Sequence, residues 1–223
     1  MHIRPKPWAR PELLACGFFI ETATEMRGRW QEAFERRAPL HLELGCGKGT
    51  FIAALGRRHP EINYLAVDMI DAVLGLAKRN VEQAYAPEAV DNVRLTAWDI
   101  ARIGEMLAPK DAVERIYINF CNPWPKRRYQ KKRLTHARQL EQYKKFMVPG
   151  AQIHFKTDDD PLFEASLKYF EDSGFQVTTL IRDLHASDEY PGNIITEHER
   201  MFADQGIKIK LAVAEFNGEL KAF

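Results

Sequence analysis

The hydrophobic and polar positions of this chain follow two periods. Short apolar runs bounded by turn residues predict buried strands, and apolar residues spaced three and four apart predict amphipathic helices. The expected strands span residues 40–44, 64–67, 93–97, 116–120, 151–155, 176–180 and 209–216. The expected helices span residues 51–58, 72–85, 100–107, 135–146 and 161–173. This alternation predicts an α/β fold with a mostly parallel sheet and helices on both faces.

Residues 1–37 precede this pattern as an N-terminal extension. The extension begins basic and proline-rich, and Met26, Trp30 and Phe34 then recur at helical spacing, which predicts a helix over residues 25–37. Residues 38–223 are expected to form one domain, large enough to bury a substantial core.

Three helix ends carry recognisable signals. Asp71 is placed to cap the second helix of the α/β pattern, and Gly174 is placed to end the fifth. One of the consecutive acids Asp158, Asp159 and Asp160 should cap the helix that follows them, and Asp160 is the expected cap.

Composition narrows the class of protein. The 32 Lys and Arg residues nearly balance the 31 Asp and Glu residues, so a nucleic-acid interface would have to be local. The three cysteines lie far apart without a C-x-x-C motif, which argues against a disulfide framework and a zinc site and favours a reducing cytoplasm. The sequence shows neither a signal-peptide core nor an apolar run of about 18 residues, so neither secretion nor a membrane span is expected.

A glycine-rich turn follows the first expected strand of the α/β pattern. Residues 40–50 read LHLELGCGKGT, and Gly45, Gly47 and Gly49 would let the backbone approach a ligand closely. The turn lacks the G-x-x-x-x-G-K-[ST] pattern of a phosphate loop, and Thr50 weakens a dinucleotide-binding interpretation. An NAD-dependent dehydrogenase is therefore a weak alternative.

Acidic residues end three successive strands. Glu43, Asp68 and Asp99 would meet where ligands bind in open α/β sheets. A carboxylate at Glu43 would repel a pyrophosphate and suits the cationic amino-acid part of S-adenosylmethionine. Asp68 could accept the ribose hydroxyls and Asp99 could meet the adenine amino group, although each could also be a strand-end cap. The pattern resembles the class I S-adenosylmethionine-dependent methyltransferases, which implies a Rossmann-like, seven-stranded sheet whose last strand, residues 209–216, is antiparallel.

A basic segment follows the fourth expected strand. Residues 115–140 contain eight Lys and Arg residues and no acid, with six of the basic residues in 126–133. Such a cluster would bind a phosphate backbone by releasing counterions, or it could be a solvated helix start. Within the segment, Trp124 could stack on a base or pack against the sheet.

Four motifs resemble the bacterial tRNA (guanine-N(7)-)-methyltransferases. They are residues 4–8 (RPKPW), 119–134 (NFCNPWPKRRYQKKRL), 154–158 (HFKTD) and 192–199 (GNIITEHE). The resemblance covers essentially the whole chain and implies methylation of N7 of guanosine 46 in the tRNA variable loop. By this resemblance, residues 38–223 would be the methyltransferase domain and tRNA the macromolecular partner.

The resemblance also implies site residues. Cofactor contacts are expected from Glu43, Gly45, Gly47, Asp68, Asp99 and Asn122. Substrate contacts are expected from Lys126, Asp158, Thr196, Glu197, His198 and Glu199. RNA contacts are expected from Arg128, Tyr129, Gln130, Lys131, Lys132 and Arg133. We hypothesise that Asp158 and Glu199 hold the amino edge of the guanine.

The chain departs from the family pattern at Asn122, where the family often has a catalytic Asp. An amide cannot act as a base, but N7 of guanine has an in-plane lone pair and no proton, so it can attack the methyl group directly. Asn122 is therefore expected to act in catalysis by positioning, through hydrogen bonds that its amide donates and accepts.

Two alternatives stay open. The N-P-x-P sequence at residues 122–125 is reminiscent of methyltransferases that act on exocyclic amines of nucleic acids, and Asn122 would also suit an RNA-binding subunit without catalysis. A metal ion is not expected, and the sequence leaves both a monomer and a homodimer possible.

Overall fold

The computed structural model describes residues 4–218 and divides into two compact units, Met1–Asp111 and Ala112–Phe223. Each unit is described by itself. The expected boundary after residue 37 and the single-domain organisation stay predictions.

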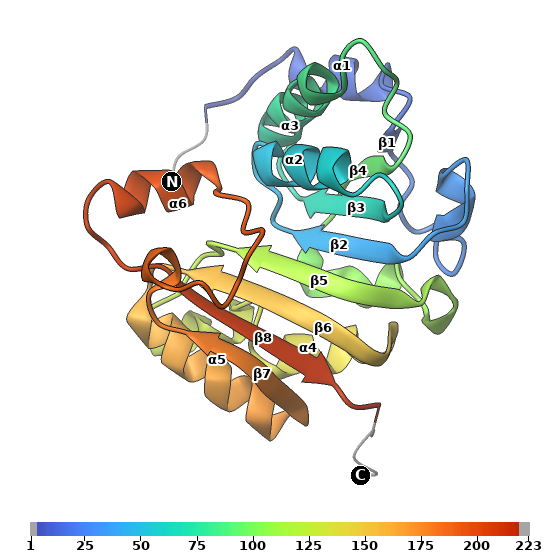
Figure 1. The fold of residues 1–223 in the computed structure, drawn as a ribbon. Coiled ribbons are helices and arrows are strands. Elements are labelled where there is room, and N and C mark those ends of the chain that lie inside the picture. Colours follow the sequence, from blue (N-terminus) through green and yellow to red (C-terminus); the bar gives the residue numbers. More distant parts are fainter. Residues whose placement is uncertain (1–3, 219–223) are drawn as a thin grey trace. The chain divides into compact units, whose positions relative to one another are not determined.

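The first unit is built on four parallel strands in the order β1–β4–β3–β2 (Figure 1). The strands are β1 (Phe19–Ile20), β2 (Leu40–Leu44), β3 (Asn63–Asp68) and β4 (Val93–Ala97). All five residues of β2 are buried, as expected for a parallel strand that is covered on both faces. Because the strands are parallel, their carboxyl ends share one edge of the sheet.

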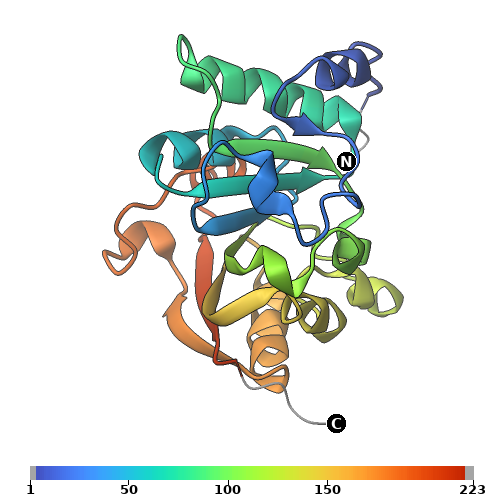
Figure 2. The ribbon, with the colours of Figure 1, turned by 90° about the vertical axis from the view of Figure 1, so that its right-hand side faces the viewer.

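Three α-helices belong to the first unit: α1 (Ala9–Leu14), α2 (Thr50–Arg58) and α3 (Asp71–Tyr85). Helices α2 and α3 pack together and against β3 and β4, and α1 lies beside α3 (Figure 2). A Cβ atom added to Gly75 of α3 would lie 2.7 Å from the Cβ atom of Ala9, so glycine is what allows the two helices to approach. The 3-10 helices η1 (Trp30–Ala33), η2 (Ile100–Glu105) and η3 (Pro109–Asp111) complete the unit.

The second unit contains four strands in the order β5–β6–β8–β7. They are β5 (Val113–Asn119), β6 (Met147–Thr157), β7 (Phe175–Ile181) and β8 (Lys210–Phe216). Strands β5 and β6 are parallel, whereas β8 runs antiparallel to both β6 and β7. The helices are α4 (Ala137–Tyr143), α5 (Asp160–Asp172) and α6 (Glu197–Ala203), with the 3-10 helices η4 (Arg127–Lys132) and η5 (Leu184–Ala186).

The predicted α/β class, with a mostly parallel sheet and an antiparallel last strand, is confirmed. All seven expected strands are present, and residues 4–218 contain an eighth, the two-residue β1. The helix expected over residues 25–37 is wrong, because only Trp30–Ala33 forms a 3-10 turn. The backbone N–H groups of Gly28 and Trp30 donate to the carboxylate of Asp111 instead of to carbonyl oxygens one helical turn earlier. The Trp30 side chain is nevertheless fully buried, as its spacing suggested.

Other helix ends differ in detail. Asp71 does not cap α3: the N-cap is Ile70, and Asp71 is the first helical residue. The carboxylate of Asp68 accepts from the backbone N–H groups of Met69 and Ile70 just before that helix. Gly174 follows α5 in the left-handed conformation, with φ of 80°, which confirms it as the end of that helix. The segment expected as helix over residues 100–107 is a 3-10 helix interrupted at Arg102.

Candidate functional site

The glycine turn of the first unit leaves β2 at the carboxyl edge of the sheet. The backbone N–H groups of Gly45 and Cys46 both donate to the carbonyl oxygen of Val67 on β3, at 2.9 and 3.1 Å. Gly47 has φ of 54°, and apart from Gly47 and its two chain neighbours no described heavy atom lies within 4 Å of the position its Cβ would occupy. Open space beside a left-handed glycine is what a closely approaching ligand requires.

Gly49 serves packing rather than ligand approach. A Cβ atom at this position would lie 2.7 Å from the Cβ and 2.9 Å from the Cα of Ala77 on α3. The third glycine of the turn therefore allows the first turn of α2 to pack closely against α3.

Asp68 links the glycine turn to the end of β3. One carboxylate oxygen accepts from the N–H of Gly47 at 3.1 Å, and the other accepts from Met69 and Ile70 at 2.8 and 3.2 Å. Burial raises the pKa of Asp68, and these backbone hydrogen bonds act in the opposite direction. Carboxylate oxygens have further lone pairs, so Asp68 can also accept from a ligand hydroxyl.

The other two acids of the first unit lie at the same edge. Glu43 is the fourth residue of β2, is 2% exposed, and pairs in register with Ala66, two residues before Asp68. Asp99 follows β4, and its carboxylate accepts from the N–H of Ala101 at 2.9 Å, so it caps η2. The structure thus brings Glu43, Asp68 and Asp99 to the carboxyl ends of three adjacent strands.

The thiol of Cys46 lies beside this acidic edge. Burial raises its pKa well above the ordinary value, and the negative charges of Glu43 and Asp68 raise it further. The thiol therefore stays protonated at neutral pH and does not act as a nucleophile.

In the second unit, the loop after β5 has an unusual backbone. Phe120 and Trp124 both adopt positive φ, at 52° and 44°. Such strain in residues other than glycine is concentrated at functional sites. The exposed Asn122 lies between them, and its side-chain oxygen accepts from the N–H of Trp124 at 3.1 Å, which stabilises the turn.

The side chains of the basic segment that follows, residues 126–133, differ in burial. Lys126, Arg128, Lys131 and Lys132 are exposed, whereas Tyr129 and Gln130 are half-buried. The ammonium of Lys132 lies 5.1 Å from the ring centre of Trp124 and 5.3 Å from that of Tyr129. Arg133 is only 4% exposed and donates from Nε to the carbonyl oxygen of Pro123 at 2.7 Å. Arg133 thus braces the loop, whereas these four exposed cations lie at the surface.

The three consecutive acids after β6 divide their roles. Asp159, not Asp160, is the N-cap of α5, and its carboxylate accepts from the N–H of Leu162 at 2.6 Å, so the expected cap was wrong by one residue. Asp160 instead forms an ion pair with Lys210 at 2.6 Å. Lys210 also donates to the backbone oxygen of Asp158, whose side chain is half-buried.

The motif at residues 196–199 begins α6 with a capping box. The Thr196 hydroxyl accepts from the N–H of Glu199, and the Glu199 carboxylate accepts from the N–H of Thr196. Thr196 and Glu199 are buried, whereas Glu197 and His198 are exposed. The motif therefore presents its two middle residues to solvent and uses its outer two to build the helix start.

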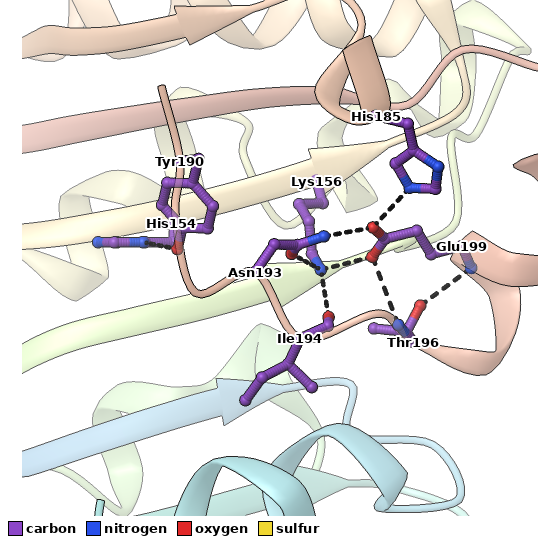
Figure 3. A network of polar contacts seen from close by, with 8 residues as sticks. All are labelled: His154, Lys156, His185, Tyr190, Asn193, Ile194, Thr196 and Glu199. Carbon is purple, nitrogen blue, oxygen red and sulfur yellow. Dashed lines mark hydrogen bonds and ion pairs between the residues drawn. The ribbon is translucent and has the colours of Figure 1, made fainter. Parts of the chain in front are cut away.

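A buried polar network surrounds Glu199 (Figure 3). One carboxylate oxygen accepts from His185 at 2.9 Å and from Asn193 at 2.6 Å, and the other lies 2.7 Å from the ammonium of Lys156. Lys156 and Asn193 lie within the motifs 154–158 and 192–199, but the sequence predicts no role for either of them or for His185. The available signal was a lysine within the apolar strand sequence of residues 151–157, where a charge requires a buried partner.

Membrane-spanning helices and clustered metal ligands are both absent from residues 4–218. No helix in this range is both long and apolar enough to cross a membrane. The same residues contain no group of three or more His, Cys, Asp or Glu side chains that could hold a metal ion.

Comparison with known proteins gives consistent matches. A family model described as "Putative methyltransferase" matches residues 37–212. A tRNA (guanine-N(7)-)-methyltransferase of Clostridium beijerinckii is 56% identical over 216 residues, which cover 96% of this chain and 98% of that protein. The crystal structure of the 16S rRNA methyltransferase KamB superposes with a TM-score of 0.62 at 13% identity, over 84% of this chain and 92% of that chain. The magnesium protoporphyrin IX methyltransferase of Synechocystis, solved with bound SAM, gives a TM-score of 0.54 at 11% identity, over 80% of this chain and 70% of that chain. At these low sequence identities the two matches show a shared fold and nothing more.

Proposed function

The chain belongs to the tRNA (guanine-N(7)-)-methyltransferase family, and we propose that it methylates N7 of guanosine 46 in the tRNA variable loop. It is an S-adenosylmethionine-dependent methyltransferase. The observation that carries the proposed reaction is the 56% identity to a relative of that name over 98% of the relative's length. Every predicted site residue, from Glu43 to Glu199, lies inside the span 37–212 that the family model matches.

The residues of the first unit fit the proposed cofactor. S-adenosylmethionine supplies an electrophilic methyl group on a sulfonium centre and carries no phosphate. Glu43 would face its cationic amino-acid part, Asp68 would accept from the ribose hydroxyls, and Asp99 would accept from the adenine amino group. The open positions at Gly45 and Gly47 would admit the ligand next to the backbone.

In the second unit, the proposed catalytic task is alignment. The guanine N7 has a lone pair in the ring plane and no proton to lose, so no general base is needed. Asn122 would position the reacting groups from its strained loop, near 3–3.5 Å and in line. Methylation places positive charge on the ring, and the carboxylate of Asp158 is the group we propose to stabilise it.

The exposed cations of the basic segment are proposed to hold the tRNA backbone. Arg128, Lys131 and Lys132 are the proposed phosphate contacts, with Tyr129 and Gln130 beside them. Arg133 would act indirectly, because its guanidinium is buried against the loop. We further propose a cytoplasmic location and a monomer or homodimer, with residues 38–223 as one methyltransferase domain.

Methyl transfer to an unmodified tRNA transcript tests this function. The purified chain is incubated with S-adenosylmethionine and tRNA, the RNA is digested to nucleosides, and the products are identified by mass spectrometry. We expect 7-methylguanosine with the natural transcript and none when guanosine 46 is replaced by adenosine. A methylated adenine would instead support the exocyclic-amine alternative, and cofactor binding without any methylated nucleoside would support the non-catalytic one.

A further inference from the structure

One face of β6 carries polar side chains in place of a helix contact. Side chains alternate along a strand, so His154 and Lys156 share one face and Phe155 points to the other. The Phe155 ring lies 6.2 and 6.4 Å from the rings of Phe163 and Phe170 on α5. On the opposite face, the segment 183–199 lies against His154 and Lys156 (Figure 3).

Lys156 makes the denser of the two contacts with that segment. Its side chain is 4% exposed, and its ammonium donates to Asn193 Oδ1, to the backbone oxygen of Ile194 and to Glu199 Oε2, at 3.0, 3.0 and 2.7 Å. An ammonium has three protons, so these three bonds satisfy it. They join one strand residue to three points of the segment spread over seven residues.

Glu199 receives this contact as a fully buried carboxylate. Burial acts to raise its pKa, but the charge of Lys156 and the hydrogen bonds from Lys156, His185 and Asn193 outweigh burial and lower it. The carboxylate is therefore ionised at neutral pH. Because Glu199 also completes the capping box with Thr196, the ion pair ties the first turn of α6 to β6.

Lys156 also connects to the loop that follows β5. Its backbone oxygen accepts from the N–H of Phe120 at 2.9 Å. The Phe120 ring in turn stacks on His198, with ring centres 6.1 Å apart and an interplanar angle of 20°. One residue of β6 thus contacts both the loop that carries Asn122 and the segment that carries Glu197 and His198.

A second anchor lies two residues earlier on the same face. His154 Nδ1 is 2.7 Å from the hydroxyl of Tyr190, and the two rings lie 5.8 Å apart. His154 is itself supported by Gln152 at 3.1 Å and by the ring of Tyr117 at 5.3 Å. This contact holds the middle of segment 183–199, and Lys156 holds its end.

We propose that Lys156 is a positioning residue for substrate: by holding Glu199, it fixes segment 183–199 and presents the exposed Glu197 and His198 to the methyl acceptor. The proposal rests on the proposed function and keeps, for Glu197 and His198, the substrate contact that the family resemblance implies. It assigns Glu199 an indirect role, because its two oxygens are already engaged within the protein.

The test compares two buried lysines of the second unit. Lys156→Met keeps an unbranched four-atom stem and removes the ammonium. Lys144→Met is the matched control, because Lys144 is also 4% exposed and pairs with an acid, Glu141, but contacts Ser173 instead of segment 183–199. For both variants, the KM values for tRNA and for S-adenosylmethionine are measured together with hydrogen exchange of peptides from residues 183–203.

For Lys156→Met we expect the KM for tRNA to rise about 10- to 100-fold. We also expect faster exchange in residues 183–203, while the KM for S-adenosylmethionine stays within about twofold, a selectivity that general loss of structure would not produce. Lys144→Met should change neither the KM for tRNA nor exchange in this segment. A folded Lys156→Met enzyme with the wild-type KM for tRNA would overturn the proposal.

Two further outcomes are decisive. If Lys156→Met does not fold, Asn193→Ala takes its place, because it removes one acceptor of the Lys156 ammonium and one donor to Glu199. Faster exchange in residues 183–203 with a raised KM for tRNA would then support positioning, and wild-type values of both would overturn it. If the wild-type enzyme leaves tRNA unmethylated, the proposed function fails, whereas the exchange comparison still shows whether Lys156 holds the segment.

Discussion

The ammonium of Lys156 lies 2.7 Å from the carboxylate of Glu199, and the two side chains are 4% and 0% exposed. Removing two charges from water is costly, and their attraction offsets that cost only where further hydrogen bonds complete the site. Here Asn193, His185 and backbone groups supply those bonds. The pair is therefore stable as a whole and vulnerable to the loss of either partner.

Glu199→Gln should strongly destabilise the protein, because it leaves the ammonium of Lys156 buried without a counter-charge. We expect a loss of about 3–5 kcal/mol in the free energy of unfolding at pH 7. Urea unfolding followed by circular dichroism measures it. Glu197→Gln is the control, since Glu197 lies two residues before Glu199 in the same helix and is exposed. Equal unfolding midpoints for the two variants would contradict the assigned role of the pair.

The stability difference between wild type and Glu199→Gln should depend on pH. The pKa of Glu199 in the folded protein is lowered from 4.5, so its stabilising contribution is complete above that value and is lost as the pH falls through the folded-state pKa. The stability difference between wild type and Glu199→Gln should therefore be constant from pH 7 to about pH 5 and shrink in more acidic solution. A difference that widened on acidification would have the wrong sign.

Gly49→Ala and Gly47→Ala should separate packing from ligand approach. Both positions have positive φ, which costs about 1–2 kcal/mol for alanine. Gly49→Ala should lose about 1–3 kcal/mol more, because its methyl group overlaps Ala77. Gly47→Ala should show only the backbone cost but bind S-adenosylmethionine more weakly by calorimetry. Equal unfolding free energies for the two variants would show that Gly49 has no special packing role.

Periodicity was a reliable guide where the local rule and the tertiary fold agree. All five residues of Leu40–Leu44 are buried because a parallel strand is covered on both faces, although only the leucine face is apolar and His41 and Glu43 lie on the other. The two-residue β1 was missed because so short a run has no period. The 25–37 helix was wrong because the carboxylate of Asp111, about eighty residues away in the chain, takes the N–H groups of Gly28 and Trp30.

The candidate site could be predicted in part for the same reason. Strand-end acids such as Asp68 follow from strand order, so their meeting at one edge could be foreseen. The partners of Glu199 could not, because Lys156 and His185 lie 43 and 14 residues from it in the chain. The local T-x-x-E capping box turns the Glu199 carboxylate back toward Thr196, but its complete burial against Lys156 depends on this distant network.

Asp159→Ala should destabilise α5 more than Asp160→Ala does. Asp159 supplies the N-cap hydrogen bond to Leu162, and its loss should cost about 1 kcal/mol. Asp160 is 74% exposed, so solvent screens its ion pair and its loss should cost about 0–1 kcal/mol, while Lys210, itself 7% exposed, keeps its bond to the backbone oxygen of Asp158. Thermal unfolding of the two variants in parallel measures the difference. A lower melting temperature for Asp160→Ala than for Asp159→Ala would indicate that Asp160, and not Asp159, is the N-cap of α5.

Lys131→Ala and Arg133→Ala should weaken tRNA binding by different routes. Lys131 is exposed, so its loss should lower affinity and reduce the slope of log K against log salt by about 0.7–0.9 if it contacts one phosphate. Arg133 is buried and braces Pro123, so its loss should lower the melting temperature and leave the salt slope unchanged. Filter binding from 50 to 200 mM salt distinguishes them. A reduced slope for Arg133→Ala would make it a direct phosphate contact.

Asn122→Asp and Asn122→Ala should separate positioning from base catalysis. The Asn122 side-chain oxygen accepts from the N–H of Trp124, and Asp can make this bond whereas Ala cannot. Because N7 carries no proton, we propose that the reaction needs the turn and not a base. We therefore expect Asn122→Asp to keep kcat within a few-fold of wild type, with no new acidic limb in its pH profile. Asn122→Ala should lower kcat about 10- to 100-fold through misalignment. A large gain in kcat for Asn122→Asp that appears with a single acidic pKa would show that a base assists transfer and that the natural Asn122 limits the rate.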